Sequence, residues 1–247
     1  MNDAVPGSSI DADAAFAVHI DARPEPFDLN LTQTAIVVVD LQNGYASPGG
    51  YRELIGQDIS AARRVIGNTL RLLDAARAAA LTVILLKNGW DIELKSAGGP
   101  RSPNWHKSNP LKTMRARPEL KGKILTHGSW DYEFVDDLKP APSDIVVPKA
   151  RYSGFCGTEL DNILRARDIR SLIFAGIAAN VCVESTIRDA YHREFFCLLI
   201  GDATLQSGPP FLQDATIYNV ERYLGWVTTT DTVCAAITQK WPRPHFS

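Results

Sequence analysis

The sequence predicts an α/β protein with a three-layer αβα architecture, built on an open, six-stranded, parallel, doubly wound sheet of the Rossmann-like kind. Six short apolar runs, rich in β-branched residues, are continuous rather than alternating, which is typical of strands buried on both faces. Helical patterns separate most of these runs, and such alternation indicates a parallel sheet covered by helices. Six strands without an internal repeat favour an open sheet over a barrel.

The elements follow in order along the 247 residues, a length that suits one large α/β domain. Residues 1–30 are rich in Pro, Asp and Ala without sustained periodicity, so we expect an N-terminal arm before a single domain over residues 31–247. The expected strands are 35–40, 82–87, 144–148, 171–176, 196–201 and 225–228. The expected helices are 59–80, 158–168, about 181–194, 210–224 and 231–239.

Two long segments interrupt this pattern. Residues 41–57 are rich in Gly, Tyr and Pro, and residues 88–130 contain three Trp with little periodicity. Loops of this length in a compact domain are usually functional or disordered. Their aromatic content favours ordered loops that face a substrate.

Composition excludes several classes of partner. With 28 acidic against 26 basic residues and a net charge of -2, nothing favours nucleic acid or an anionic membrane. No apolar run approaches the roughly 20 residues of a membrane helix. The first residues carry acids and no basic region before an apolar stretch, so we expect no secretory signal and a cytoplasmic protein.

Three reactive residues stand where ligands bind in doubly wound sheets, just beyond the carboxyl ends of the strands. Asp40 ends the first expected strand, Lys149 ends the third, and the fourth leads through a short segment to Cys182 at the start of a helix. A helix start and a nearby ammonium stabilise a thiolate, and a carboxylate can accept the thiol proton and return it. The backbone N–H groups of Ala178 and Cys182 are candidates for an oxyanion hole.

Each of these residues also has a structural interpretation. Cys182 could be a packed thiol, Asp40 a cap for the following turn, and Lys149 a solvated strand end. Their convergence at one edge favours chemistry, because the structural interpretations give no reason for it. Cys197 lies in an apolar strand and Cys234 on the last helix, so we expect packing for both, while Cys156 in a Gly-flanked loop stays open.

The segments VVVDLQNGY, PKARYSGF and GIAANVCVESTIRDA resemble the isochorismatase-like cysteine hydrolases. The resemblance extends over nearly all of the chain beyond about residue 30. It implies the six-stranded parallel sheet, an Asp40–Lys149–Cys182 triad and a homo-oligomer, dimer or tetramer. It also implies a cis peptide bond between Ile177 and Ala178.

The loops NGYASPGGY, NGW, SPNWHKSN and GKILTHGSWDYEFVDDL resemble those of the ureidoacrylate amidohydrolases of pyrimidine-ring degradation. This implies a small ureido substrate, 3-ureidoacrylate, cleaved to 3-aminoacrylate with carbon dioxide and ammonia as eventual products. The implied substrate contacts are Tyr45, Tyr51, Asn88, Trp90, Ser108, Asn109 and Tyr152. Ser96 departs from the pattern, because an acidic residue is expected there.

No cofactor is expected, and the histidines argue against a metal. The related nicotinamidases bind a metal through an Asp and paired histidines, whereas His106 and His127 stand alone in their loops. Two alternatives stay open. One is a family amidohydrolase for biuret, an N-carbamoyl compound or nicotinamide, which a substrate panel distinguishes. The other is a non-catalytic interaction protein on this scaffold, which thiol reactivity distinguishes.

Overall fold

The computed structural model describes residues 16–240, and its centre is one six-stranded sheet. The strands are β1 (Ala17–Ile20), β2 (Phe27–Asn30), β3 (Thr34–Val39), β4 (Thr82–Asn88), β5 (Ile145–Lys149), β6 (Ser171–Ile177), β7 (Phe196–Leu205) and β8 (Trp226–Thr228). The central sheet has the order β5-β4-β3-β6-β7-β8, and every pair in it is parallel. The predicted six-stranded parallel sheet is therefore confirmed.

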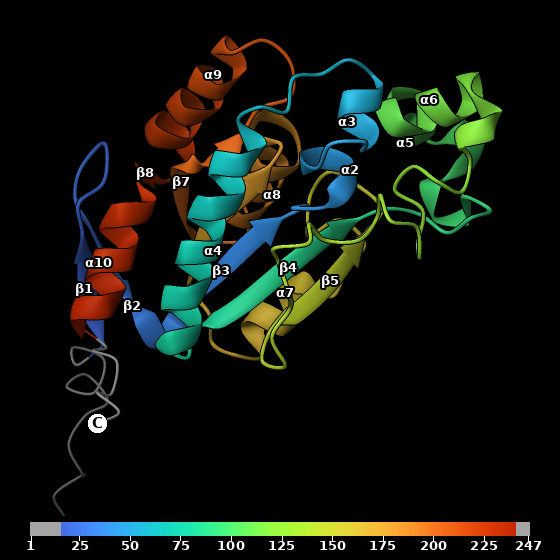
Figure 1. The fold of residues 1–247 in the computed structure, drawn as a ribbon. Coiled ribbons are helices and arrows are strands. Elements are labelled where there is room, and N and C mark those ends of the chain that lie inside the picture. The colour runs from blue at the N-terminus through green and yellow to red at the C-terminus, as the bar shows by residue number, and fades with distance from the viewer. Residues whose placement is uncertain (1–15, 241–247) are drawn as a thin grey trace, which may run out of the picture.

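Helices cover both faces of this sheet (Figure 1). The α-helices are α2 (Asn43–Ala46), α3 (Tyr51–Leu54), α4 (Ala62–Ala78), α5 (Pro103–Lys107), α6 (Asn109–Ala116), α7 (Leu160–Arg165), α8 (Glu184–Tyr191), α9 (Phe211–Asn219) and α10 (Thr230–Lys240). The 3-10 helices are η1 (Leu31–Gln33), η2 (Lys95–Ala97), η3 (Gly99–Arg101) and η4 (Pro118–Leu120), and the π-helices are η5 (Ala179–Val183) and η6 (Val220–Leu224).

Two cores lie on opposite faces of the sheet because successive side chains of a strand alternate. Ile36 and Val38 of β3 pack in one core with residues of α4 and α10. Val37 and Val39 pack in the other core with residues of α7 and α8. This arrangement confirms the three-layer αβα architecture and explains why β3 is apolar at every position from Ala35 to Val39.

The segments that we expected to be an arm and two loops contain short strands and helices. Residues 17–30, part of the expected arm, form an antiparallel hairpin of β1 and β2, and Arg23 exchanges two 2.9 Å backbone hydrogen bonds with Val227 of β8. Residues 1–15, the rest of that arm, lie outside the described residues. Residues 41–57 include α2 and α3, and residues 88–130 include α5 and α6. No described helix has the length and apolarity needed to cross a membrane.

Candidate active site

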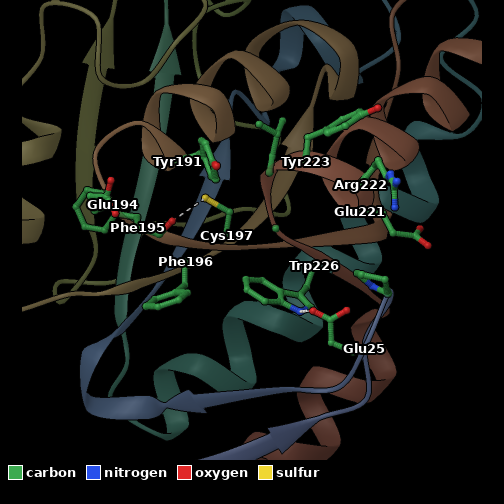
Figure 2. A pocket seen from close by; sticks show the side chains of 13 residues that line it. Glu25, Tyr191, Glu194, Phe195, Phe196, Cys197, Glu221, Arg222, Tyr223 and Trp226 are labelled. Carbon is green, nitrogen blue, oxygen red and sulfur yellow. Dashed lines mark hydrogen bonds between the residues drawn. The ribbon is translucent and has the colours of Figure 1, made fainter.

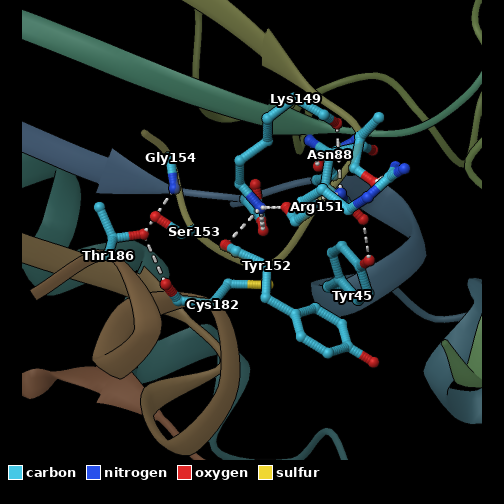
Figure 3. Close-up of polar contacts among 12 residues, drawn as sticks. Tyr45, Asn88, Lys149, Arg151, Tyr152, Ser153, Gly154, Cys182 and Thr186 are labelled. Atoms are coloured by element: carbon cyan, nitrogen blue, oxygen red, sulfur yellow. Dashed lines mark hydrogen bonds and ion pairs between the residues drawn. The ribbon is translucent and has the colours of Figure 1, made fainter. Parts of the chain in front are cut away.

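The carboxyl edge of the sheet brings the three predicted reactive residues together. Figure 3 shows two of them, Lys149 and Cys182. Asp40 directly follows β3, Lys149 is the last residue of β5, and Cys182 lies in η5, just beyond β6. β6 approaches β3 closely at this edge, since a Cβ on Gly176 would lie 2.1 Å from the Val39 carbonyl oxygen. The peptide bond between Ile177 and Ala178 is cis, as expected.

Asp40 and Lys149 form a buried ion pair. The Lys149 Nζ lies 2.7 Å from Asp40 Oδ2, and neither side chain is exposed to solvent. The ammonium also donates to the backbone carbonyls of Arg151 and Tyr152, at 3.1 Å each. Two backbone carbonyls and the Asp40 carboxylate thus surround the ammonium. The Cys182 thiol lies within hydrogen-bonding reach of both charged groups.

Burial favours the protonated form of the Cys182 thiol. Burial raises the pKa of Cys182 to about 12, and although the Lys149 charge acts to lower it, Asp40 acts to raise it. From the sequence we expected Lys149 to stabilise the thiolate and Asp40 to accept the thiol proton. The Lys149 charge does act to lower the pKa of Cys182, and burial acts more strongly in the opposite direction. A buried thiol of this kind becomes a good nucleophile only when a base removes its proton.

The neighbouring carboxylate is suited to take this proton. Burial raises the pKa of Asp40 above its usual value, despite the opposing effects of Lys149 and of the Cys182 thiol, and a higher pKa makes it a stronger base. Burial would lower the pKa of Lys149, but the charge of Asp40 raises it overall, so the amine stays an ammonium. The site thus combines a neutral thiol, a strengthened base and a fixed positive charge.

Four of the seven predicted substrate contacts line one pocket with Cys182. They are Tyr45, Tyr51, Asn109 and Tyr152. Ala178, the other predicted oxyanion residue, lines the same pocket. The remaining lining residues are Arg52, Ile55, Gln57, Pro110, Ile177, Val181 and Ser207. Sulfur therefore faces a cavity with aromatic walls and a small number of polar groups, as expected of a small-molecule site.

Asn88 lies beside this pocket and positions one of its walls. Its register partner in β5 is Lys149, whose carbonyl accepts a 3.2 Å hydrogen bond from Asn88 Nδ2. Asn88 Oδ1 accepts a 2.8 Å hydrogen bond from the Tyr45 hydroxyl. Both ends of the amide are thus engaged, and Asn88 is not among the residues that line the pocket.

Two further predicted contacts lie outside the pocket. Trp90 is 2% exposed, packs in an apolar cluster with Tyr51, and donates its ring N–H to the Ala150 carbonyl at 3.2 Å. Ser108 is buried and lines a separate groove, which Tyr152 shares and in which the exposed Cys156 also lies. The Ser96 hydroxyl donates to Asp91, in a loop outside the pocket.

Sequence reasoning missed residues that hold these segments together. The Thr186 hydroxyl on α8 donates to the Cys182 carbonyl at 2.6 Å and accepts from the Gly154 N–H at 2.9 Å (Figure 3). These two hydrogen bonds link the helix that follows Cys182 to the loop after Lys149. Gln42 exchanges hydrogen bonds with the backbone of Asn88. Gln42 could have been recognised as a candidate site residue, because it lies two residues after Asp40. No sequence signal identifies Thr186.

The other candidate centres differ from this one. Cys197 is fully buried at the amino end of β7, as expected of a packed thiol, and burial raises its pKa to about 12. It lines a second cavity with Phe196 and Trp226 at the amino ends of β7 and β8, the edge of the sheet opposite to Cys182 (Figure 2). Within residues 16–240, no group of three His, Cys, Asp or Glu side chains is placed to hold a metal ion.

The fold and this cluster define a class of proteins: three-layer α/β domains that carry an acid, an amine and a thiol at the carboxyl edge of a parallel sheet. The model of the isochorismatase domain matches residues 34–232. The chain belongs to the isochorismatase family.

Curated relatives and solved structures agree with this. A ureidoacrylate amidohydrolase RutB of Agrobacterium fabrum is 57% identical over 90% of this chain and 98% of that protein. Another RutB, from Stutzerimonas stutzeri, is 57% identical over 88% of each chain. The crystal structure of a cysteine hydrolase from Pseudomonas syringae pv. phaseolicola superposes with a TM-score of 0.71 at 30% identity, covering 86% of this chain and 96% of that one.

Proposed function

We propose that this chain is a ureidoacrylate amidohydrolase that cleaves the ureido group of (Z)-3-ureidoacrylate in pyrimidine catabolism. The substrate rests on the 57% identity to proteins of that name over nearly their whole length. The reaction type rests on one observation: a buried thiol that lines a pocket lies against the Asp40–Lys149 ion pair.

The reaction starts when Asp40 takes the Cys182 proton as sulfur adds to the ureido carbonyl. Lys149 stabilises the negative charge on sulfur during the transfer. The carbonyl oxygen becomes an oxyanion, for which the backbone N–H groups of Ala178 and Cys182 are the proposed donors. Asp40 then returns the proton to the departing nitrogen, which leaves a thioester-type acyl group on Cys182. Water, deprotonated by Asp40, attacks this group and restores the thiol.

The nucleophile assignment has a direct test. Replacing Cys182 by Ser should lower kcat for 3-ureidoacrylate by more than about 10³-fold, because the hydroxyl is a poorer nucleophile in this setting. Circular dichroism should show an unchanged fold, because the two side chains have nearly the same size. Retention of one tenth of the activity, or a covalent adduct trapped on Cys156, would contradict the assignment.

The substrate needs a separate test. Purified protein should be assayed under one set of conditions on 3-ureidoacrylate, N-carbamoyl amino acids, biuret and nicotinamide, with and without a chelator. We expect 3-ureidoacrylate to have the highest kcat/KM and the chelator to have no effect. A higher kcat/KM on another of these compounds would contradict the proposed substrate but not the hydrolase class. Loss of activity with the chelator would contradict the expectation of a metal-free site.

We also propose a cytoplasmic homo-oligomer, dimer or tetramer. Exposed aromatic side chains beside the second cavity would suit an interface, since Tyr191 is 47%, Phe196 52% and Tyr223 61% exposed (Figure 2). Light scattering gives the mass in solution, and a monomer at micromolar concentration would contradict this proposal.

A further inference from the structure

A buried arginine without an acidic partner lies in the pocket of Cys182. Arg52 of α3 is only 4% exposed. Its Nε donates to Gln57 Oε1 at 2.9 Å, and its Nη2 donates to the Gln206 carbonyl at 2.8 Å. Its Nη1 is also buried and has no hydrogen-bond acceptor among the residues that the structure describes. No described carboxylate forms an ion pair with this guanidinium.

This arrangement is unusual for a buried charge. Arginine stays protonated at any physiological pH, even though burial lowers the pKa of Arg52. Buried charges are normally paired, because moving them out of water is unfavourable. Two neutral acceptors fix the plane of the guanidinium, and the Asp58 carboxylate acts on its charge without forming an ion pair with it. One nitrogen, Nη1, has no described acceptor. An anion beside Nη1 would supply the acceptor that it lacks.

The pocket indicates where this anion lies. Arg52 and Cys182 line the same cavity from different elements, α3 and η5. Among the described residues that line it, Arg52 is the only base and no acid is present. An anionic group in the cavity therefore has one positively charged partner among the described lining residues. Cys182 lines the same cavity.

We propose that Arg52 binds the carboxylate of the substrate while the ureido carbonyl lies against Cys182. This inference rests on the proposed function and extends it, because it explains how the site selects ureido acids over neutral ureas and amides. A guanidinium donates to a carboxylate through parallel hydrogen bonds, which fixes the orientation as well as the position of the ligand. Arg52 is thus a specificity-determining residue, distant in sequence from Lys149 and Cys182.

The test compares an acid with its neutral counterpart. Wild type, Arg52→Met, Arg52→Lys and the surface control Arg64→Met are assayed on 3-ureidoacrylate and on its methyl ester, which keeps the ureido group and lacks the charge. Arg52→Met should lower kcat/KM for the acid by about 10²-fold, mostly through KM, and change that for the ester by less than about 3-fold. Arg52→Lys should be intermediate, and Arg64→Met should match wild type.

The ratio of acid to ester within each variant does not depend on how much protein is folded, so partial instability of Arg52→Met leaves the comparison valid. If Arg52→Met leaves the ratio of kcat/KM for the acid to that for the ester unchanged, whether or not both values fall, the inference is overturned. Equal losses on both substrates would assign Arg52 a structural role. If wild type fails on 3-ureidoacrylate, the same comparison is made with N-carbamoyl-β-alanine and propylurea. A preference for the acid that disappears in Arg52→Met would then support the carboxylate site while the proposed substrate fails; no preference would overturn both.

Discussion

Asp40 is the residue whose environment most directly sets the behaviour of the site. Burial raises the pKa of this carboxyl above its usual 3.8, and only the ionised form can accept the thiol proton. Activity should therefore be lost as the pH falls through this raised pKa, so the acidic limb of the kcat/KM profile should lie above pH 3.8. Because Asp40, Lys149 and Cys182 are coupled, the limb reports an apparent pKa of the group.

Replacing Asp40 by Asn supplies the control. The amide keeps the shape of the side chain but cannot take a proton, so residual activity should be low and should lack the acidic limb. A wild-type limb centred at or below pH 3.8, or the same limb in the Asn variant, would contradict the assigned base.

At the scale of single residues, the sequence predicted the reactive residues that adjoin the ends of strands. Asp40, Lys149 and Cys182 each adjoin a recognisable strand, and strands of a parallel sheet end at one edge. Arg52 could not be predicted, because its burial depends on Gln57 and on Gln206, which is far away in the chain. The protonation state of Cys182 was also beyond the sequence, because it depends on how completely the thiol is buried.

At the scale of elements, one carboxylate holds the short helix α3 against the loop after residue 120. Asp131 Oδ1 accepts from the Tyr51 N–H at 3.0 Å, and Oδ2 accepts from the Leu125 N–H at 2.9 Å. Gly44 allows this approach, since a Cβ there would lie 2.5 Å from Asp131 Oδ2. Asp131 therefore fixes the element that carries both Tyr51 and Arg52 into the pocket.

Replacing Asp131 by Ala should disturb binding more than chemistry. Two buried N–H groups would lose their acceptors, which costs about 1–3 kcal/mol each. We expect a lower Tm and a higher KM for 3-ureidoacrylate, with a smaller effect on kcat because Cys182 is not displaced. Asp136→Ala, an exposed carboxylate in the same segment, is the matched control. A KM equal to that of wild type would show that α3 does not depend on Asp131.

Elements with a clear period were predicted well, and those without one were missed. The 17 residues of α4 fall within the predicted 59–80 helix because a long amphipathic pattern marks them. The helices α2 and α3 have four residues each, about one turn, which is too short for a pattern to show. The four-residue strands of the β1–β2 hairpin were missed for the same reason.

At the scale of the whole molecule, removing one partner of the buried ion pair should destabilise the fold. Replacing Lys149 by Met leaves Asp40 as an unpaired buried carboxylate, which should lower the free energy of unfolding by about 3–5 kcal/mol. The double variant Asp40→Asn, Lys149→Met removes both charges and should recover much of this loss while remaining inactive. Urea denaturation followed by circular dichroism measures both quantities.

The stability of the Lys149→Met variant should depend on pH, because its loss of stability comes from the charge of Asp40. Without the cation, the pKa of Asp40 in the folded state rises further above that of the unfolded chain, so the folded state binds the proton more tightly. Its stability should therefore increase as the pH is lowered toward the unfolded pKa and decrease as the pH rises through the folded one. A loss of stability independent of pH would point to packing instead of charge.

The position of Lys149 has a consequence for the working enzyme. β5 is an edge strand, hydrogen-bonded within the sheet only to β4, and Lys149 is its last residue. Edge elements open locally with less free energy than the whole fold requires. Detachment of β5 would withdraw the cation from Asp40 while β3 and β6 stay paired, so activity should disappear at a lower urea concentration than the helical signal. If activity and the helical signal are lost at the same urea concentration, the prediction is contradicted. If activity is lost first, the active site has a lower stability than the fold that carries it.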